Sequence, residues 1–91
     1  MIISKKIVAG SEKPPLEPVV RNTAQLGAAL FRFRKQISWT QRQVGERSSI
    51  KQSMVSQVEA GTPGTRLGTL FKLLAALDLE LVVRNRKKSL S

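Results

Sequence analysis

The chain has 91 residues, of which 41% are hydrophobic, enough apolar material for one modest core rather than two. It contains no cysteine and no histidine, which excludes a disulfide framework, a thiolate metal site and catalytic groupings built on those residues. Its six carboxylates are scattered, so no paired-acid site can be drawn. We therefore expect one small domain that is not an enzyme and that needs no metal and no cofactor.

Charge distinguishes the parts of the chain. Sixteen Lys and Arg against six Asp and Glu give a net charge of +10, which favours a polyanionic partner. Residues 21–61 carry seven basic and two acidic side chains, residues 84–91 carry four basic and no acidic ones, and residues 62–83 are balanced. The balanced segment is a candidate for protein contacts. The sequence has no apolar run long enough for a membrane span and no signal-peptide pattern, so we expect a cytoplasmic protein.

Residues 1–20 are expected to form a flexible or partner-dependent N-terminal arm. Pro14, Pro15 and Pro18 forbid a continuous helix there, because each proline lacks a backbone N–H and restricts the residue before it. Lys5 and Lys6 leave two interpretations open: an arm that follows DNA phosphates, or a solvated tail. Residues 21–84 are expected to form the folded domain, and residues 85–91 a basic tail that either contacts phosphates or only adds solubility.

The first helix is predicted to begin at Asn22 or Thr23, with Gln25 placed to complete a capping box. The apolar residues that follow are spaced as one stripe of a helix, at i, i+4, i+7 and i+11. They are Leu26, Leu30, Phe33 and Ile37.

The second helix has the strongest local signals in the sequence. Thr40 and Gln43 form a T-x-x-Q capping box, and Trp39 precedes them as a hydrophobic staple for Val44. The helix should therefore begin at Thr40. Free N–H groups at such a helix start can bind a phosphate oxygen, so Thr40 and Gln41 are candidates for contacts with a DNA backbone.

A third helix is predicted over about residues 52–59, with Met54, Val55 and Val58 turned inward and Gly61 ending it. Its remaining side chains have the chemistry of a major-groove reader, because lysine can donate to guanine, glutamine can pair with adenine, and serine can bond to a base or a phosphate. A merely solvated polar face is the alternative. These polar residues are Lys51, Gln52, Ser53, Ser56 and Gln57.

Beyond a Pro-Gly turn, a fourth helix is predicted to close the core with Leu67, Leu70, Phe71, Leu74 and Leu77. Residues 79–84 then alternate as a β-strand does. A lone strand needs a partner, and the same strand of a second copy would supply one. The alternative is an extension of the fourth helix. The residues assigned to this dimer strand are Leu79, Leu81, Val82 and Val83.

The run TQRQVGERSSIKQSMVSQVEAG resembles the helix-turn-helix of the Xre and lambda-type repressor family. With WTQ, IKQ and TLFKLLAALDLELVV, residues 23–84 are most similar to HipB-type antitoxins. Two departures are Ser49, where the turn usually has glycine, and Lys51, where the helix cap is usually serine. The features that carry the resemblance are Thr40-Gln41, Gly45, Ile50, Val55 and Glu59-Ala60-Gly61.

The resemblance implies a mainly α, lambda-repressor-like domain of four to five short helices whose C-terminal β-strand pairs across a dimer. It also implies that Arg34 and Glu59 form a structural salt bridge. Base-reading positions carry over to Lys51, Gln52, Ser53 and Gln57. Phosphate-contacting positions carry over to Thr40, Gln41 and Ser56.

The function implied is that of a sequence-specific repressor that binds double-stranded palindromic operators as a homodimer. Its protein partner would be a HipA-like Ser/Thr kinase toxin, with or without a further small subunit. Two alternatives stay open at this point: a stand-alone Xre-family repressor, and a protein-binding adaptor with weak DNA binding.

Overall fold

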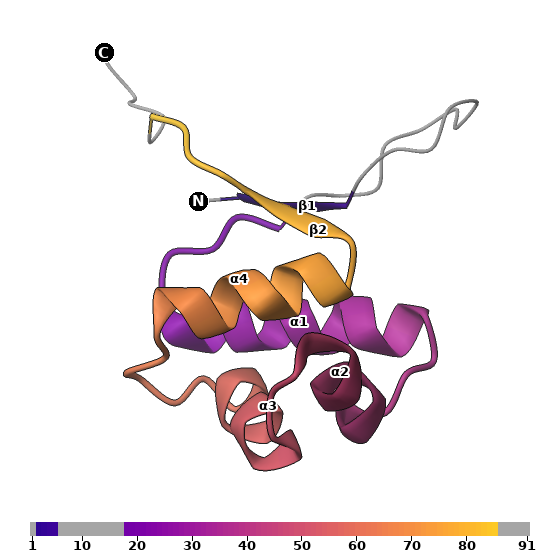
Figure 1. The fold of residues 1–91 in the computed structure, drawn as a ribbon. Helices are drawn as coiled ribbons and strands as arrows, with labels where there is room; N and C mark the ends of the chain where they lie inside the picture. The colour runs from indigo at the N-terminus through magenta and orange to yellow at the C-terminus, as the bar shows by residue number, and fades with distance from the viewer. Residues whose placement is uncertain (1, 6–17, 86–91) are drawn as a thin grey trace, which may run out of the picture.

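The computed structural model describes residues 2–5 and 18–85, which form four helices and a two-stranded sheet (Figure 1). The sheet lies across one side of the domain, and α2 and α3 lie on the opposite side (Figure 1). This arrangement confirms the mainly helical fold with a C-terminal strand. The elements are β1 (Ile2–Lys5), α1 (Thr23–Gln36), α2 (Gln41–Ser48), α3 (Gln52–Glu59), α4 (Leu67–Ala76) and β2 (Leu79–Val82).

The core is mainly aliphatic and draws on all six elements. The predicted stripe of α1 is confirmed, because Leu26, Leu30 and Phe33 are buried and Ile37 packs against them. Asn22 caps α1 by accepting a hydrogen bond from the N–H of Gln25. The Gln25 side chain, however, accepts from the N–H of Arg21, one residue before the expected cap position. None of the helices in the described residues is long and apolar enough to cross a membrane.

The apolar residues of α3 and α4 are less deeply buried than expected. Met54 is partly exposed, because Val55 and Val58 form the inward side of α3. In α4 the buried stripe is Leu70, Leu73, Leu74 and Leu77. Leu67 and Phe71, predicted in the core, are instead 65% and 51% exposed. The face of α4 that carries them is therefore an apolar surface rather than part of the core.

The expected N-terminal arm is wrong for residues 2–5. These residues form β1, which pairs antiparallel with β2 so that Ile2 lies opposite Val82 and Lys5 opposite Leu79. Ile3 is fully buried, and its N–H donates a hydrogen bond to the carbonyl of Pro18, two residues before the buried Val20. β1 is held in place by the burial of Ile3 and by its pairing with β2. Both depend on residues far away in the sequence, so the residues next to β1 do not predict it. Residues 6–17, with Lys6, Pro14 and Pro15, and the tail 86–91 lie outside the described residues.

β1 also corrects the expectation that β2 depends on a second copy for pairing. One edge of β2 is paired within the chain, and in the described residues β1 is its only neighbour in the sheet. The strand itself is confirmed, although it ends at Val82 rather than at residue 84. A second copy can therefore pair only with the other edge.

Gly27 lets α1 and α3 approach each other at the level of their backbones. A Cβ on Gly27 would lie 2.5 Å from the carbonyl oxygen of Val58 and closer still to that of Glu59. Because neither backbone atom can rotate away, we expect Gly27→Ala to lower the free energy of unfolding by about 1–3 kcal/mol. Chemical denaturation followed by circular dichroism measures this change.

Gly68 provides the matched control for this prediction. It also lies in a helix, but a Cβ there would have no heavy atom within 4 Å. Gly68→Ala should raise the free energy of unfolding by up to about 1 kcal/mol, because alanine has the higher helix propensity. Two alanine variants of equal stability would contradict the close approach of α1 and α3.

Candidate nucleic-acid interface

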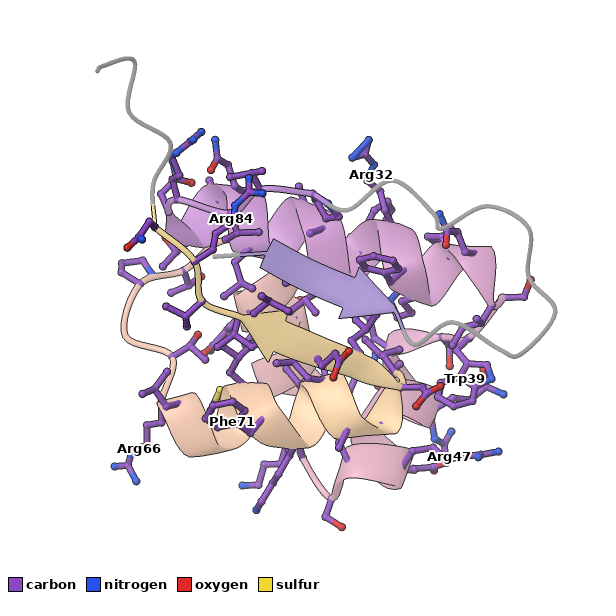
Figure 2. All side chains as sticks on the ribbon, turned by 90° about the horizontal axis from the view of Figure 1, so that it is seen from above. Arg32, Trp39, Arg47, Arg66, Phe71 and Arg84 are labelled. Atoms are coloured by element: carbon purple, nitrogen blue, oxygen red, sulfur yellow. The ribbon has the colours of Figure 1, made fainter. Side chains whose placement is uncertain are left out.

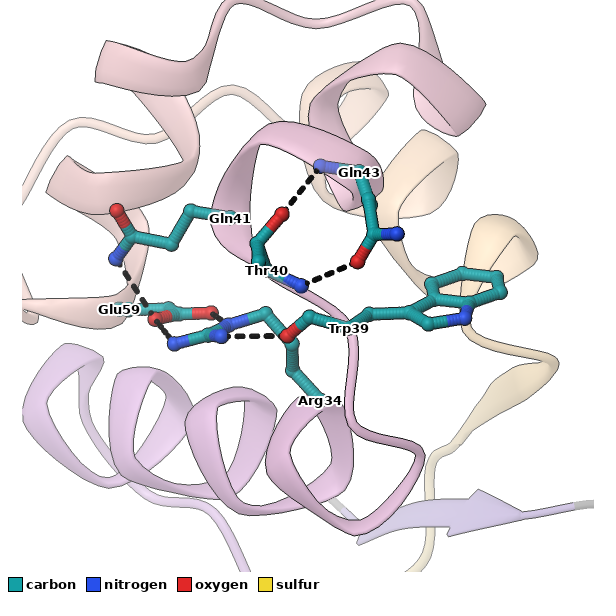
Figure 3. A network of polar contacts seen from close by, with 6 residues as sticks. All are labelled: Arg34, Trp39, Thr40, Gln41, Gln43 and Glu59. Carbon is teal, nitrogen blue, oxygen red and sulfur yellow. Dashed lines mark hydrogen bonds and ion pairs between the residues drawn. The ribbon is translucent and has the colours of Figure 1, made fainter.

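The start of α2 is built by the capping box that the sequence predicts. The N–H of Gln43 donates to the hydroxyl oxygen of Thr40 at 3.0 Å, and the N–H of Thr40 donates to the side-chain oxygen of Gln43 at 2.8 Å (Figure 3). Trp39 packs against the core cluster that contains the buried Val44. The guanidinium of Arg47 stacks 4.7 Å from the centre of the Trp39 ring. These contacts anchor the N-terminus of α2 at the surface of the domain.

The turn between α2 and α3 has a left-handed residue at Ser49, with φ 59° and ψ 41°. Glycine is the usual residue in that conformation, and the departure noted in the sequence is thus accommodated without a different turn. The N–H of Ile50 donates to the carbonyl of Gly45 at 2.8 Å. A Cβ on Gly45 would lie 2.6 Å from the carbonyl oxygen of Ile50, so the absence of a side chain allows this tight closure.

We expect Ser49→Gly to stabilise the domain by about 0.5–1 kcal/mol. A left-handed non-glycine residue costs about 1–3 kcal/mol, and the greater freedom of glycine in the unfolded chain offsets part of the gain. Ser56→Gly is the control, since Ser56 lies inside α3 and the same change should destabilise a helix interior. Thermal unfolding should therefore shift in opposite directions for the two variants.

The polar edge of α3 is presented to solvent while its apolar side docks on the core. Val55 and Val58 are buried, and α3 begins directly after Lys51. The four candidate base-reading residues are all exposed. They are Lys51, Gln52 and Ser53 at the beginning of the helix and Gln57 one turn further on.

The phosphate candidates differ in how freely their side chains can reach a ligand. Thr40 and Ser56 are exposed, although the hydroxyl of Thr40 already serves the capping box. Gln41 is half-buried, and its side-chain nitrogen donates to a carboxylate oxygen of Glu59 at 3.0 Å. Gln41 therefore has a structural role that its position in the sequence did not reveal, because its partner lies 18 residues away.

Arg34 and Glu59 form a buried ion pair that ties α1 to the end of α3 (Figure 3). The Arg34 Nε and Nη2 atoms donate to the two carboxylate oxygens of Glu59 at 2.6 Å and 3.0 Å. Arg34 Nη1 also donates to the carbonyl of Trp39 at 2.7 Å. Together with the Gln41 contact, this network joins α1, the start of α2 and the end of α3. It leaves the only carboxylate of α3 neutralised.

The geometry is thus that of two short helices joined by a tight turn, with the second helix exposing a polar, acid-free edge beside a capped helix start. This geometry defines a helix-turn-helix domain. Residues 30–83 match the model of the helix-turn-helix family.

Proteins of similar sequence and structure show which branch of the helix-turn-helix family this chain resembles. Antitoxin HipB of Escherichia coli K12 is 31% identical over 70 residues, which cover 77% of this chain and 80% of that protein. A chain of the solved HipA-HipB-O2-O3 complex superposes with a TM-score of 0.72 at 32% identity, covering 76% of this chain and 97% of that one. A chain of the solved HipB-O4 20mer complex gives the same values. The chain therefore belongs to the helix-turn-helix family, in its HipB-type antitoxin branch.

Proposed function

We propose that this protein is a sequence-specific repressor that binds double-stranded DNA, and that it is the antitoxin component of an operon encoding a HipA-like kinase toxin. The observation that carries the proposal is the exposed edge Lys51, Gln52 and Ser53 at the start of a braced helix. Glu59, the only acidic residue of α3, is buried against Arg34, so the exposed edge of the helix carries no negative charge. Bound at an operator, the protein acts at the nucleoid.

The roles of the exposed side chains follow from their chemistry. Lys51 can donate to the O6 and N7 atoms of guanine, and Gln52 and Gln57 can each pair with the N6 and N7 atoms of adenine. Ser53 can bond to either base, whereas Thr40 and Ser56 lie where contacts with phosphate would orient the helix. For Gln41, the backbone N–H at the start of α2 is the more suitable phosphate donor, since its side chain is bonded to Glu59.

In a homodimer, the recognition helix α3 of one protomer is related by a two-fold axis to α3 of the other. Two recognition helices in such a dimer would enter major grooves about 34 Å apart, which requires a palindromic operator with half-sites one helical turn apart. In β2, Leu79 contributes to the core of its own protomer, while Val82 and the following residue, Val83, are exposed and available to a second copy. Basic side chains elsewhere on the domain would add affinity without sequence preference.

The proposed protein partner is a HipA-like Ser/Thr kinase toxin, with or without a further small subunit. Support comes from the similar chain in the HipA-HipB-O2-O3 complex, which covers 76% of this chain. Autorepression follows if the same dimer binds the operator of its own operon and retains the kinase. Co-purification of a kinase with the tagged protein from its native host would support this assignment.

Selection of bound sites from random duplexes tests the DNA-binding proposal most directly. We expect enrichment of a palindrome whose half-sites are centred about one helical turn apart. The enriched sequence also reports the base preferences of Lys51 and Gln52. Weak binding without enrichment, lost at moderate salt, would instead identify an adaptor that holds DNA only by charge.

A further inference from the structure

The two edges of β2 face different surroundings. Seen from above, β1 lies between β2 and α1, whereas the other edge of β2 faces the side of α4 (Figure 2). On that side the described chain supplies no strand. An unpaired edge presents free N–H and C=O groups, and these pair readily with another chain.

The open edge lies beside an apolar surface formed by α4 and the end of β2. Phe71, on α4, lies on the side of β2 away from β1 (Figure 2). Leu67 and Phe71 are 65% and 51% exposed, and Val83, the residue after β2, is 79% exposed. Residues 62–83 have balanced charge in a chain of net charge +10, so a second copy can approach here without strong repulsion.

β1 is held firmly enough to count as part of the sheet. Ile3 is fully buried opposite Leu81, and Leu79 is buried on the same face of β2. The N–H of Ile3 points away from β2, since it donates to the carbonyl of Pro18 at 3.4 Å. Successive residues of a strand direct their backbone groups to opposite sides, so the N–H of Ser4 points towards β2.

We propose that the two copies of the dimer form one continuous antiparallel sheet in the order β1-β2-β2′-β1′, in which β1 is the outer strand that ends the assembly. The inference rests on the proposed homodimer. Antiparallel pairing of identical edges is two-fold symmetric, and each copy uses its open edge once. Because β1 occupies the remaining edge of β2, no third copy can pair with β2, and the outward N–H of Ile3 on β1 is itself bonded to Pro18.

Single cysteines test the strand order, and the chain has no cysteine that would interfere. Ser4 and Glu80 are opposite each other in the register of β1 and β2. Spin labels on Glu80→Cys should lie nearer to each other across the dimer than labels on Ser4→Cys. The lateral separations are about one and three strand spacings, roughly 5 and 14 Å. The reverse order, or equal distances, overturns the proposal.

Sedimentation of the same samples separates this inference from the proposed function. If the chain stays monomeric at micromolar concentration, the proposed dimer is wrong, and the four-stranded sheet that depends on it is wrong as well. A dimer in which the Ser4→Cys labels are the nearer pair would contradict only the outer position of β1. The proposed two-fold repressor would be unaffected.

Ser4→Pro tests whether β1 ends the assembly. Proline removes the N–H that points to β2 while leaving Ile3 in place. We expect species larger than the dimer, together with helical circular dichroism like that of the unaltered chain. The control is Thr23→Pro at the first position of α1, where proline is tolerated and the sheet is untouched. A folded Ser4→Pro variant that remains a dimer contradicts the capping role of β1.

Discussion

Glu59→Ala is expected to lower the free energy of unfolding by about 3–5 kcal/mol, because removing one partner of a buried ion pair leaves the other charge uncompensated. The side chains of Arg34 and Glu59 are only 8% and 7% exposed. Glu59 also accepts a hydrogen bond from Gln41, and that donor would lose its partner as well. Urea unfolding monitored by Trp39 fluorescence and by circular dichroism measures the change.

Glu46→Ala is the matched control for this change. Glu46 pairs with Arg42 at 3.3 Å, but the two side chains are 65% and 77% exposed. Solvent screens such a pair, so the same substitution should cost no more than about 0.5 kcal/mol. Similar losses for Glu46→Ala and Glu59→Ala would show that the Arg34–Glu59 pair does not brace the helices.

The double variant Lys51→Ala, Gln52→Ala is expected to abolish most of the sequence preference. A bidentate contact between a side chain and a base contributes about 1–3 kcal/mol of discrimination, so losing two in each protomer reduces the ratio of specific to non-specific affinity by roughly 30-fold to 10⁴-fold for each half-site. Binding to unrelated duplexes should weaken far less, since only one positive charge is lost per protomer. Titration of the selected palindrome and of a scrambled duplex at one salt concentration measures the ratio.

Lys35→Ala, Gln36→Ala provides a control of identical composition. This Lys-Gln pair is exposed at the end of α1, on a different helix from Lys51 and Gln52. It should weaken binding to both duplexes equally and leave the preference unchanged. If the Lys51, Gln52 variant instead keeps the full sequence preference, the assignment of Lys51 and Gln52 as base-reading residues is wrong.

Elements encoded by neighbouring residues were predicted well from the sequence. The cap of Thr40 with Gln43, the stripe of α1 and the termination of α3 just before the left-handed Gly61 depend on contacts within a few residues of each other. The sequence showed Ser49 only as a departure from the usual glycine of this turn, and the structure shows that Ser49 adopts the left-handed backbone itself. Local physical chemistry therefore defines the helix-turn-helix almost completely.

Features that depend on distant contacts were missed. β1 pairs with a strand near the other end of the chain, and nothing within IISK distinguishes it from an extended tail. Leu67 and Phe71 fit the helical spacing of a core stripe, yet spacing does not say which apolar residues a neighbouring element covers. The base and phosphate roles stay predictions, because they depend on a ligand rather than on the fold.

Gly27 and Gly45 help to fix the position of α3 and of the exposed residues at its start. Both are places where main-chain atoms of neighbouring segments nearly touch, so the spacing there is set by rigid peptide groups rather than by adjustable rotamers. Repacking of the aliphatic core can therefore change stability while leaving the height and tilt of α3 almost unaltered. In a lineage of related repressors, the interior would be free to drift while operator choice changes through a few solvent-facing positions.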